Sequence, residues 1–366
     1  MRDPILLTPG PLTTTLATKS AMLHDWGSWD EDFNRLTAKV RAKLLAIVDA
    51  DERYVCVPLQ GSGTFAVEAA IGTLLPKQGK LLCLANGAYG KRIAQLTEVM
   101  GRRVTVIDFG ESAPVDPAAV AQALARDPEI THVALVYCET GTGILNPLDA
   151  IAAVVAAAGK KLILDAMSAF GGLPLALATL PVEAVIASSN KCLEGVPGMA
   201  FILVQKDALE NAEGRAHSLS LDLHAQWKYM ERTGQWRFTP PTHIVAALDS
   251  ALDQYEQEGG QPARLARYRD NCQALIAGLE QLGLRPYLPA ELQAPIIVTV
   301  HAPQHPNWNF QEFYRLTKAH GVIIYPGKLT VVETFRVGCI GAIGQAEMAM
   351  AIDTIARALR AMDIPC

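Results

Sequence analysis

Between residues 54 and 205, short apolar runs alternate with longer segments in which apolar side chains recur every three or four positions. The short runs are typical of buried strands and the longer segments of amphipathic helices. Alternating strands and helices form a mostly parallel sheet covered on both faces, so the pattern predicts an α/β fold. Strands are predicted at 54–59, 81–85, 104–107, 132–136, 161–165 and 182–187, and helices at 65–75, 92–100, 117–125 and 148–158.

The rest of the chain has a different rhythm, which predicts three parts. Prolines around a glycine at Leu6-Leu-Thr-Pro-Gly-Pro-Leu12 favour an extended arm over residues 1–15, which either lines a pocket, reaches a second subunit or is a plain tail. The large domain is predicted at 16–258, with a helical stretch at 206–260 in which Thr242 caps the last helix. The Gly/Gln/Pro-rich stretch 256–262 marks the junction to a small domain, 259–366.

The small domain is predicted to mix helices with a few strands. Helices are expected at 263–282, 310–320 and 345–362, a strand at 296–300, and a strand pair at 322–325 and 334–337.

Lys191 stands just after the apolar run 182–187 and just before Gly195, Pro197 and Gly198. This context places its amine at the mouth of a core, where removal from water lowers the pKa of an amine and makes it a nucleophile. The alternative is an ordinary loop lysine.

Asp165 ends the preceding predicted strand, and an acid there points into the crevice where parallel sheets bind ligands. Pyridoxal phosphate needs a carboxylate against its pyridine nitrogen and a lysine on its aldehyde, so Asp165 and Lys191 together suit that cofactor. The alternative for Asp165 is a helix cap.

The segment Gln60-Gly-Ser-Gly-Thr64 lies between a predicted strand and a predicted helix. Glycines allow close approach of a phosphate, and the helix start supplies N–H groups and partial positive charge, with Ser62 and Thr64 adding hydroxyls. The same pair of glycines also suits a dinucleotide. Neither the Walker lysine nor a full Gly-x-Gly-x-x-Gly is present.

Four further residues have two interpretations each. Tyr89 either stacks on a flat ring or fills the core. Thr140 and Thr142 either bond a cofactor oxygen or stabilise their turn. Arg336, within a predicted strand, either binds an anionic ligand or pairs with a buried acid.

Composition narrows the classes of function. The 366 residues carry a net charge of −5 and half are hydrophobic, so electrostatics favour neither nucleic acid nor an anionic membrane as a partner. Neither a transmembrane segment nor a signal-peptide core is recognised. The seven scattered cysteines favour reduced thiols and a cytoplasmic location, with no metal site.

The chain resembles the fold-type I aminotransferases of class V along nearly its whole length. The motifs that carry the resemblance are Leu7-Thr-Pro-Gly-Pro-Leu-Thr13, Leu59-Gln-Gly-Ser-Gly63, Asn86-Gly-Ala-Tyr-Gly90, Leu164-Asp-Ala-Met-Ser168, Ser189-Asn-Lys-Cys192, Ser218-Leu-Ser-Leu-Asp-Leu223, Trp236-Arg-Phe-Thr-Pro-Pro-Thr-His243, Ile324-Tyr-Pro-Gly-Lys328 and Phe335-Arg-Val-Gly338. The resemblance implies a large domain with a mostly parallel seven-stranded sheet, a smaller α+β C-terminal domain, pyridoxal 5'-phosphate as cofactor, and a homodimer with its active sites at the subunit interface.

The resemblance also implies a role for each site residue. Lys191 holds the cofactor aldehyde and shuttles a proton, and Asp165 pairs with the pyridine nitrogen. Ser62, Gly63 and Thr64 bind the phosphate, with Thr242 contributing from the partner subunit. Tyr89 stacks on the ring, Thr142 lies near the ring's phenolic oxygen, and Arg336 binds the anionic end of the substrate.

Within the family, the chain resembles the branch that transfers the amine of 2-aminoethylphosphonate to pyruvate, so the resemblance implies formation of phosphonoacetaldehyde and L-alanine in phosphonate catabolism. An alanine–glyoxylate or serine–pyruvate aminotransferase, a cysteine desulfurase-like enzyme and a catalytically silent binding module are the alternatives. Two positions depart from the expected pattern: Gly141 follows Thr140 where more threonine is expected, and position 241 is proline where serine is expected.

Overall fold

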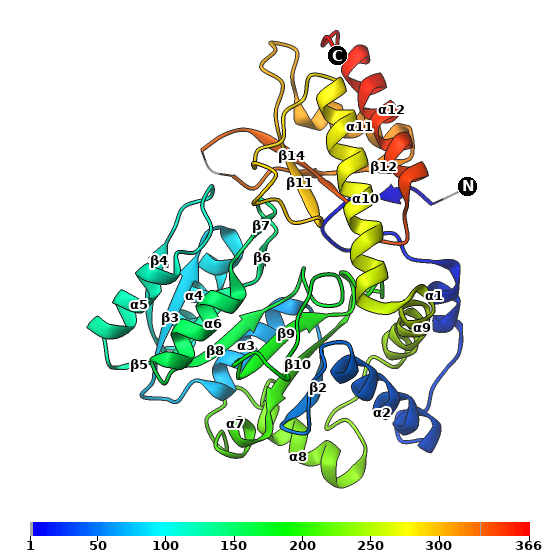
Figure 1. Cartoon of the computed structure of the whole chain (residues 1–366). Helices are drawn as coiled ribbons and strands as arrows, with labels where there is room; N and C mark the ends of the chain where they lie inside the picture. The colour runs from blue at the N-terminus through cyan, green and yellow to red at the C-terminus, as the bar shows by residue number, and fades with distance from the viewer. Residues whose placement is uncertain (1–2, 330) are drawn as a thin grey trace.

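The structure is a computed structural model that describes residues 3–329 and 331–366. Its centre is a seven-stranded sheet with the strand order β2-β10-β9-β8-β5-β3-β4, seen in the lower part of Figure 1. The strands are β2 (Tyr54–Gln60), β3 (Lys80–Ala85), β4 (Arg103–Asp108), β5 (Ile130–Val136), β8 (Lys161–Asp165), β9 (Ala184–Ser188) and β10 (Met199–Gln205). Within the described sheet β10 runs antiparallel to both its neighbours, whereas the other paired strands are parallel.

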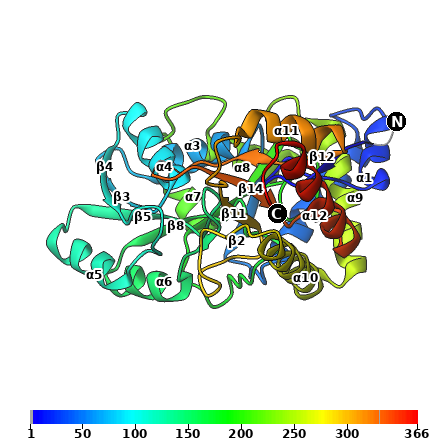
Figure 2. The ribbon, with the colours of Figure 1, turned by 90° about the horizontal axis from the view of Figure 1, so that it is seen from above.

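Helices cover both faces of this sheet because the central strands are apolar on both sides: β9 is buried at every position. One face packs against α2 (Glu31–Ala46), α5 (Pro117–Arg126), α6 (Leu148–Ala157) and α9 (Thr242–Glu258). The other packs against α3 (Gly63–Leu74), α4 (Ala88–Val99), α7 (Lys206–Glu210) and α8 (Leu223–Thr233). Figure 2 shows the two helical layers on opposite sides of the strands. The predicted α/β fold with a mostly parallel sheet is therefore confirmed.

The C-terminal part has its own small sheet and its own apolar core. The sheet has the order β11-β14-β13, and long helices pack on it in the upper part of Figure 1. The elements are α10 (Gly260–Gln281), β11 (Ile297–His301), α11 (Phe310–Ala319), β12 (Val322–Ile323), β13 (Tyr325–Pro326), β14 (Thr334–Gly338) and α12 (Gln345–Ala361).

The N-terminal segment joins this C-terminal core although it begins the chain. β1 (Ile5–Leu6) pairs in parallel with β12, and Ile5 and Leu7 are buried among the C-terminal apolar side chains. The chain then passes through α1 (Leu16–Ser20) and η1 (Ala21–Leu23) to the large sheet. Farther along the chain, after β5, β6 (Cys138–Glu139) pairs with β7 (Ile144–Leu145) in a short hairpin.

The predicted helical stretch 206–260 contains the helices α7, α8 and α9, and Gly214 and Gly234 have left-handed backbones between them. Two other local predictions need correction. The predicted strand 322–325 divides at Ile324, with β12 pairing with β1 and β13 pairing with β14. Thr242 is not a helix cap, because Pro241 occupies the cap position and Thr242 is the first residue of α9.

The division into an arm at 1–15, a large domain at 16–258 and a small domain at 259–366 stays a prediction, and residues 1 and 2 of the arm lie outside the described residues. The α9–α10 junction is sharp at the predicted place, since Gly259 and Gly260 both have left-handed backbones. Among residues 3–329 and 331–366, no helix combines the length and apolar character needed to cross a membrane.

Candidate active site

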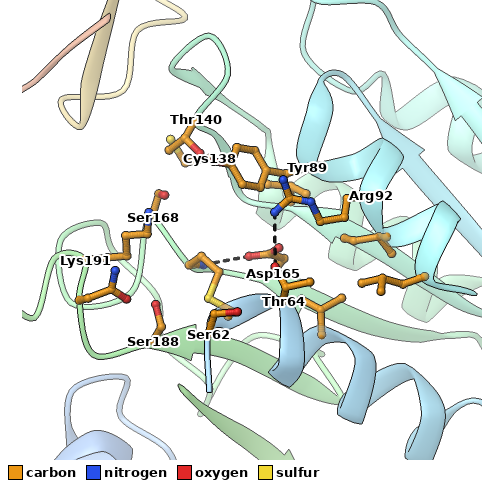
Figure 3. Close-up of a pocket in the computed structure, with 17 residues that line it drawn as sticks. Ser62, Thr64, Tyr89, Arg92, Cys138, Thr140, Asp165, Ser168, Ser188 and Lys191 are labelled. Atoms are coloured by element: carbon orange, nitrogen blue, oxygen red, sulfur yellow. Dashed lines mark hydrogen bonds between the residues drawn. The ribbon is translucent and has the colours of Figure 1, made fainter. Parts of the chain in front are cut away.

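A cavity of about 190 Å³ opens where the parallel strands end (Figure 3). The loops after β2, β3, β5, β8 and β9 supply its walls, because strands that share a direction bring their carboxyl ends to one edge of the sheet. Six of the residues predicted from the sequence line it: Ser62, Gly63, Thr64, Tyr89, Asp165 and Lys191.

Lys191 lies three positions beyond β9 and reaches the cavity from the loop. Its Nζ donates a hydrogen bond to the carbonyl oxygen of Pro9, 2.5 Å away, so the N-terminal segment lies against the amine. Burial lowers the pKa of Lys191 below its ordinary value. The site therefore favours the neutral, nucleophilic form of the amine, as the sequence predicts.

Asp165 is the last residue of β8, and its side chain is buried in the same cavity as Lys191 (Figure 3). Burial raises the pKa of Asp165 to about 6, although its Oδ1 accepts a hydrogen bond from the backbone N–H of Met167 at 3.0 Å. Burial destabilises the ionised form of this carboxyl group, and a nearby cation would stabilise it again. The position therefore suits a cationic partner.

The start of α3 forms another wall of the cavity. Ser62 occupies the cap position, yet its side chain makes no capping hydrogen bond to the helix. The first N–H groups of a helix and the partial positive charge of its N-terminus attract anions. Gly63 allows Met167 to approach, since a Cβ at that position would lie 2.5 Å from the Met167 sulfur. This wall has the features of a phosphate site.

Tyr89 comes from the first turn of α4 and contacts Arg92 of the same helix. The Arg92 guanidinium carbon lies 5.0 Å from the centre of the Tyr89 ring, and Arg92 Nη1 donates to Thr64 Oγ1 at 3.3 Å. Figure 3 shows Arg92 reaching down to Thr64 beside Asp165. The sequence reasoning missed Arg92, although residues three apart on a helix share a face and Tyr89 was already singled out.

The loop after β5 presents Thr140, not Thr142, to the cavity. Thr142 is fully buried, and its hydroxyl donates to the Glu139 carbonyl at 3.3 Å and accepts from the Ile144 N–H at 3.2 Å. These bonds match the turn-stabilising interpretation. The predicted contact between Thr142 and a cofactor stays a prediction, and Thr140 has the better position for it.

Arg336 lies on β14 and is almost completely buried, with 2% of its surface exposed. Its Nε donates to the Pro326 carbonyl at 2.9 Å and its Nη1 to the Thr140 carbonyl at 3.0 Å. Within the described residues no carboxylate lies within ion-pair distance of Arg336. The alternative in which Arg336 pairs with a buried acid is therefore not supported. Thr242 does not line the cavity of its own chain, and its predicted role in a partner subunit stays a prediction.

Comparison with known proteins decides the family. Residues 17–338 match the sequence profile of the aminotransferase class-V family. The chain belongs to the class-V aminotransferases. It is 60% identical over 361 residues to proteins of Pseudomonas entomophila and Pseudomonas putida named 2-aminoethylphosphonate–pyruvate transaminase, with 99% of this chain and 98% of each relative covered. A protein of Pseudomonas aeruginosa with the same name is 58% identical over 363 residues.

Solved structures agree on the fold of this class-V family. Pyridoxamine–pyruvate aminotransferase from Mesorhizobium loti superposes with a TM-score of 0.89 at 27% identity, covering 99% of this chain and 93% of its own. Alanine–glyoxylate aminotransferase from Nostoc sp. gives a TM-score of 0.91 at 24% identity, covering 98% and 96%. At that lower identity the similarity concerns the fold alone.

Membership of the family implies pyridoxal phosphate, and the residues present fit it. The cavity offers an uncapped helix start for the phosphate, the Tyr89 ring for the flat face of the cofactor, the buried Asp165 for the pyridine nitrogen and Lys191 for the aldehyde. One small cavity contains both a buried acid and a buried amine, and burial displaces the pKa of each. Packing alone does not explain this pair, which is typical of a functional site.

Proposed function

We propose that this chain is a pyridoxal phosphate-dependent transaminase that moves the amine of 2-aminoethylphosphonate to pyruvate, forming phosphonoacetaldehyde and L-alanine. The observation that carries the transaminase chemistry is the presence of Lys191 and Asp165 in one cavity. The substrate assignment is supported by 60% identity, over almost the entire chain, to relatives named for this reaction.

Lys191 has two tasks in this proposal. When bound, the cofactor supplies an aldehyde that accepts the amine and a ring that draws electrons from the carbon beside it. The Lys191 amine would hold that aldehyde, and the same amine would move the proton at the carbon that carries the substrate amine. Both tasks need an uncharged nitrogen, and burial favours that form because it lowers the pKa of Lys191.

Asp165 and the α3 start hold the two polar ends of the cofactor. The Asp165 carboxylate would bind the pyridine nitrogen in its protonated form, which would offset the cost of burying Asp165. The N–H groups at Gly63 and Thr64 bind the phosphate together with the Ser62 hydroxyl, and Arg92 adds a positive charge through its bond to Thr64.

Arg336 binds the anionic end of either substrate. Its fork-shaped donor set suits a carboxylate and a phosphonate alike, and no described acid competes for it. The amine donor has no carboxylate on the reacting carbon, so a second arginine for that group is not required.

We further propose a homodimer in the cytoplasm. Phe65 at the start of α3 and Phe238 before α9 are about half exposed, and both border a second hollow next to the phosphate wall. A partner copy over these aromatics would bring its Thr242 towards the site. The cytoplasmic assignment rests on six buried free cysteines among the described residues.

A panel of amine donors tests the proposal. The holoenzyme should have an absorbance band that Lys191→Ala abolishes, and 2-aminoethylphosphonate should bleach that band, with pyruvate restoring it. Rapid turnover of alanine with glyoxylate, with no response to 2-aminoethylphosphonate, would instead assign the enzyme to the alanine–glyoxylate class.

Cysteine desulfuration is a poorer fit to the structure, because a nucleophilic thiolate must be exposed and easily ionised. Burial raises the pKa of Cys192, which follows Lys191 in the sequence, to about 12.

A further inference from the structure

Lys328 belongs to a segment, Ile324-Tyr-Pro-Gly-Lys328, that connects the C-terminal sheet with the cavity. Its Nζ lies 3.3 Å from the Tyr89 hydroxyl and 4.6 Å from the centre of the Tyr89 ring. In Figure 1 this segment belongs to the orange loop before β14, which extends toward the side of the molecule that carries α4 and β4. Lys328 therefore reaches Tyr89, which lines the cavity, from the C-terminal part of the chain.

Arg336 meets the same tyrosine. Burial lowers the pKa of Arg336 and the nearby Tyr89 side chain opposes that shift, while Arg336 Nε donates to the carbonyl of Pro326, two residues before Lys328. Two cations from the C-terminal part thus lie near the Tyr89 side chain. Among residues 3–329 and 331–366, neither cation has a carboxylate within ion-pair distance. Neither cation lines the cavity itself, but each contacts a residue that does, Lys328 through Tyr89 and Arg336 through Thr140. Cations without a carboxylate partner beside a cavity are typical of an anion site.

The two substrates of the proposed function differ at their anionic ends. The phosphonate of 2-aminoethylphosphonate carries three oxygens and, like a phosphate monoester, close to two negative charges at neutral pH, whereas the carboxylate of alanine or pyruvate carries two oxygens and one charge. The phosphorus is also one bond farther from the amine-bearing carbon than the carboxylate carbon is. A fork-shaped guanidinium satisfies two oxygens, which leaves the third phosphonate oxygen and the additional charge without a partner.

We infer that Lys328 is the second cation of the anion site and determines selectivity for a phosphonate over a carboxylate, an inference that rests on the proposed function. Arg336 holds both kinds of anion from its buried position on β14. Lys328 extends farther out on a flexible stem, so its ammonium meets the third oxygen of the longer substrate and has little to bind when the anion is a carboxylate.

The test separates the two half-reactions. Stopped-flow absorbance of the holoenzyme gives the second-order rate constant with 2-aminoethylphosphonate and, in separate mixing experiments, with L-alanine. Lys328→Met keeps the length of the side chain and removes the charge. Loss of a charged hydrogen bond should lower the constant for 2-aminoethylphosphonate by about ten- to hundredfold. The constant for alanine should fall by less than about threefold, and Lys328→Arg should recover most of the phosphonate reaction.

Lys318→Met, an identical change at an exposed position of α11, is the matched control and should leave both constants as in the wild type. Equal losses for both amines in Lys328→Met would overturn the inference, because they would indicate a structural role. An unchanged reaction with 2-aminoethylphosphonate would also overturn it while leaving the proposed function intact. A wild-type enzyme that ignores 2-aminoethylphosphonate but accepts other amines would refute the proposed function itself, and the inference with it.

Discussion

The carboxylate of Glu139 accepts a hydrogen bond from the backbone N–H of Tyr89, 3.1 Å away, across the gap between β6 and the first turn of α4. The same carboxylate also accepts from Gly90 at 3.4 Å and from Gly141 at 3.0 Å. One buried acid therefore holds both the turn that carries Tyr89 and the loop that carries Thr140. A negative group at the start of α4 is also favoured by the helix dipole.

Gly87 leaves room for this acid, which leads to a first prediction. A Cβ at position 87 would lie 2.5 Å from the Glu139 carboxyl carbon, so Gly87→Ala must displace the acid or the turn. We expect a loss of about 1–3 kcal/mol in unfolding free energy, measured by urea denaturation, together with a large loss of transaminase activity. Gly27→Ala is the control, because a Cβ there meets its nearest neighbour at an ordinary 3.5 Å. Equal stability of the two variants would contradict the prediction.

Glu139 should make stability depend on pH. Burial raises the pKa of Glu139 from 4.5 to about 6, so the folded chain binds the proton more tightly than the unfolded chain does. The resulting stabilisation is complete below pH 4.5 and is lost as the pH rises through about 6. Relative to Glu139→Gln, the cofactor-free wild type should lose about 2 kcal/mol over that interval. Denaturation curves at several pH values measure this difference, with the exposed Glu280→Gln as control. A difference that does not change with pH would refute the buried-acid interpretation.

Asp165→Asn should separate stability from catalysis. The pKa of Asp165, raised to about 6, means that the ionised carboxylate costs stability above that pH in the cofactor-free chain. At pH 7 the unfolding free energy of the asparagine variant should therefore equal or exceed that of the wild type, by up to about 3 kcal/mol. This gain should disappear near pH 4. Its turnover should fall by about a hundredfold or more, because the pyridine nitrogen loses its charged partner. A variant that keeps full turnover would remove Asp165 from the site.

Substitution by valine should affect mainly activity at Thr140 and mainly stability at Thr142. Thr140 lines the cavity and its hydroxyl interacts with Tyr89, so Thr140→Val should lower kcat/KM by about tenfold with little change in stability. Thr142→Val removes two hydrogen bonds of the turn and should cost about 1–2 kcal/mol in unfolding free energy. Steady-state kinetics and thermal unfolding of both variants measure the contrast. The reverse pattern would restore the sequence-based preference for Thr142.

Local patterns in the sequence predicted the large sheet and the residues at its strand ends. Asp165 and Lys191 each follow an apolar run, and parallel strands necessarily bring such residues to one edge. Contacts between distant segments were harder to predict. The pairing of β1 with β12 and the contact of Lys328 with Tyr89 join positions more than two hundred residues apart, and neither has a periodic signal.

For a related reason the sequence did not reveal which of Thr140 and Thr142 faces the cavity. The conformation of a tight turn decides which of two nearby hydroxyls faces outward, and this turn is held by the Glu139 carboxylate, which accepts a hydrogen bond from the Gly141 N–H.

The hydrogen bond between Pro9 and Lys191 has a practical consequence. Since β1 pairs with β12, residues 5–9 connect the C-terminal core to the reactive nitrogen. Trimming them, or fusing a purification tag close to Ile5, would disturb the amine itself. A handle for purification or immobilisation therefore belongs at the opposite end of the polypeptide, beside the exposed Cys366.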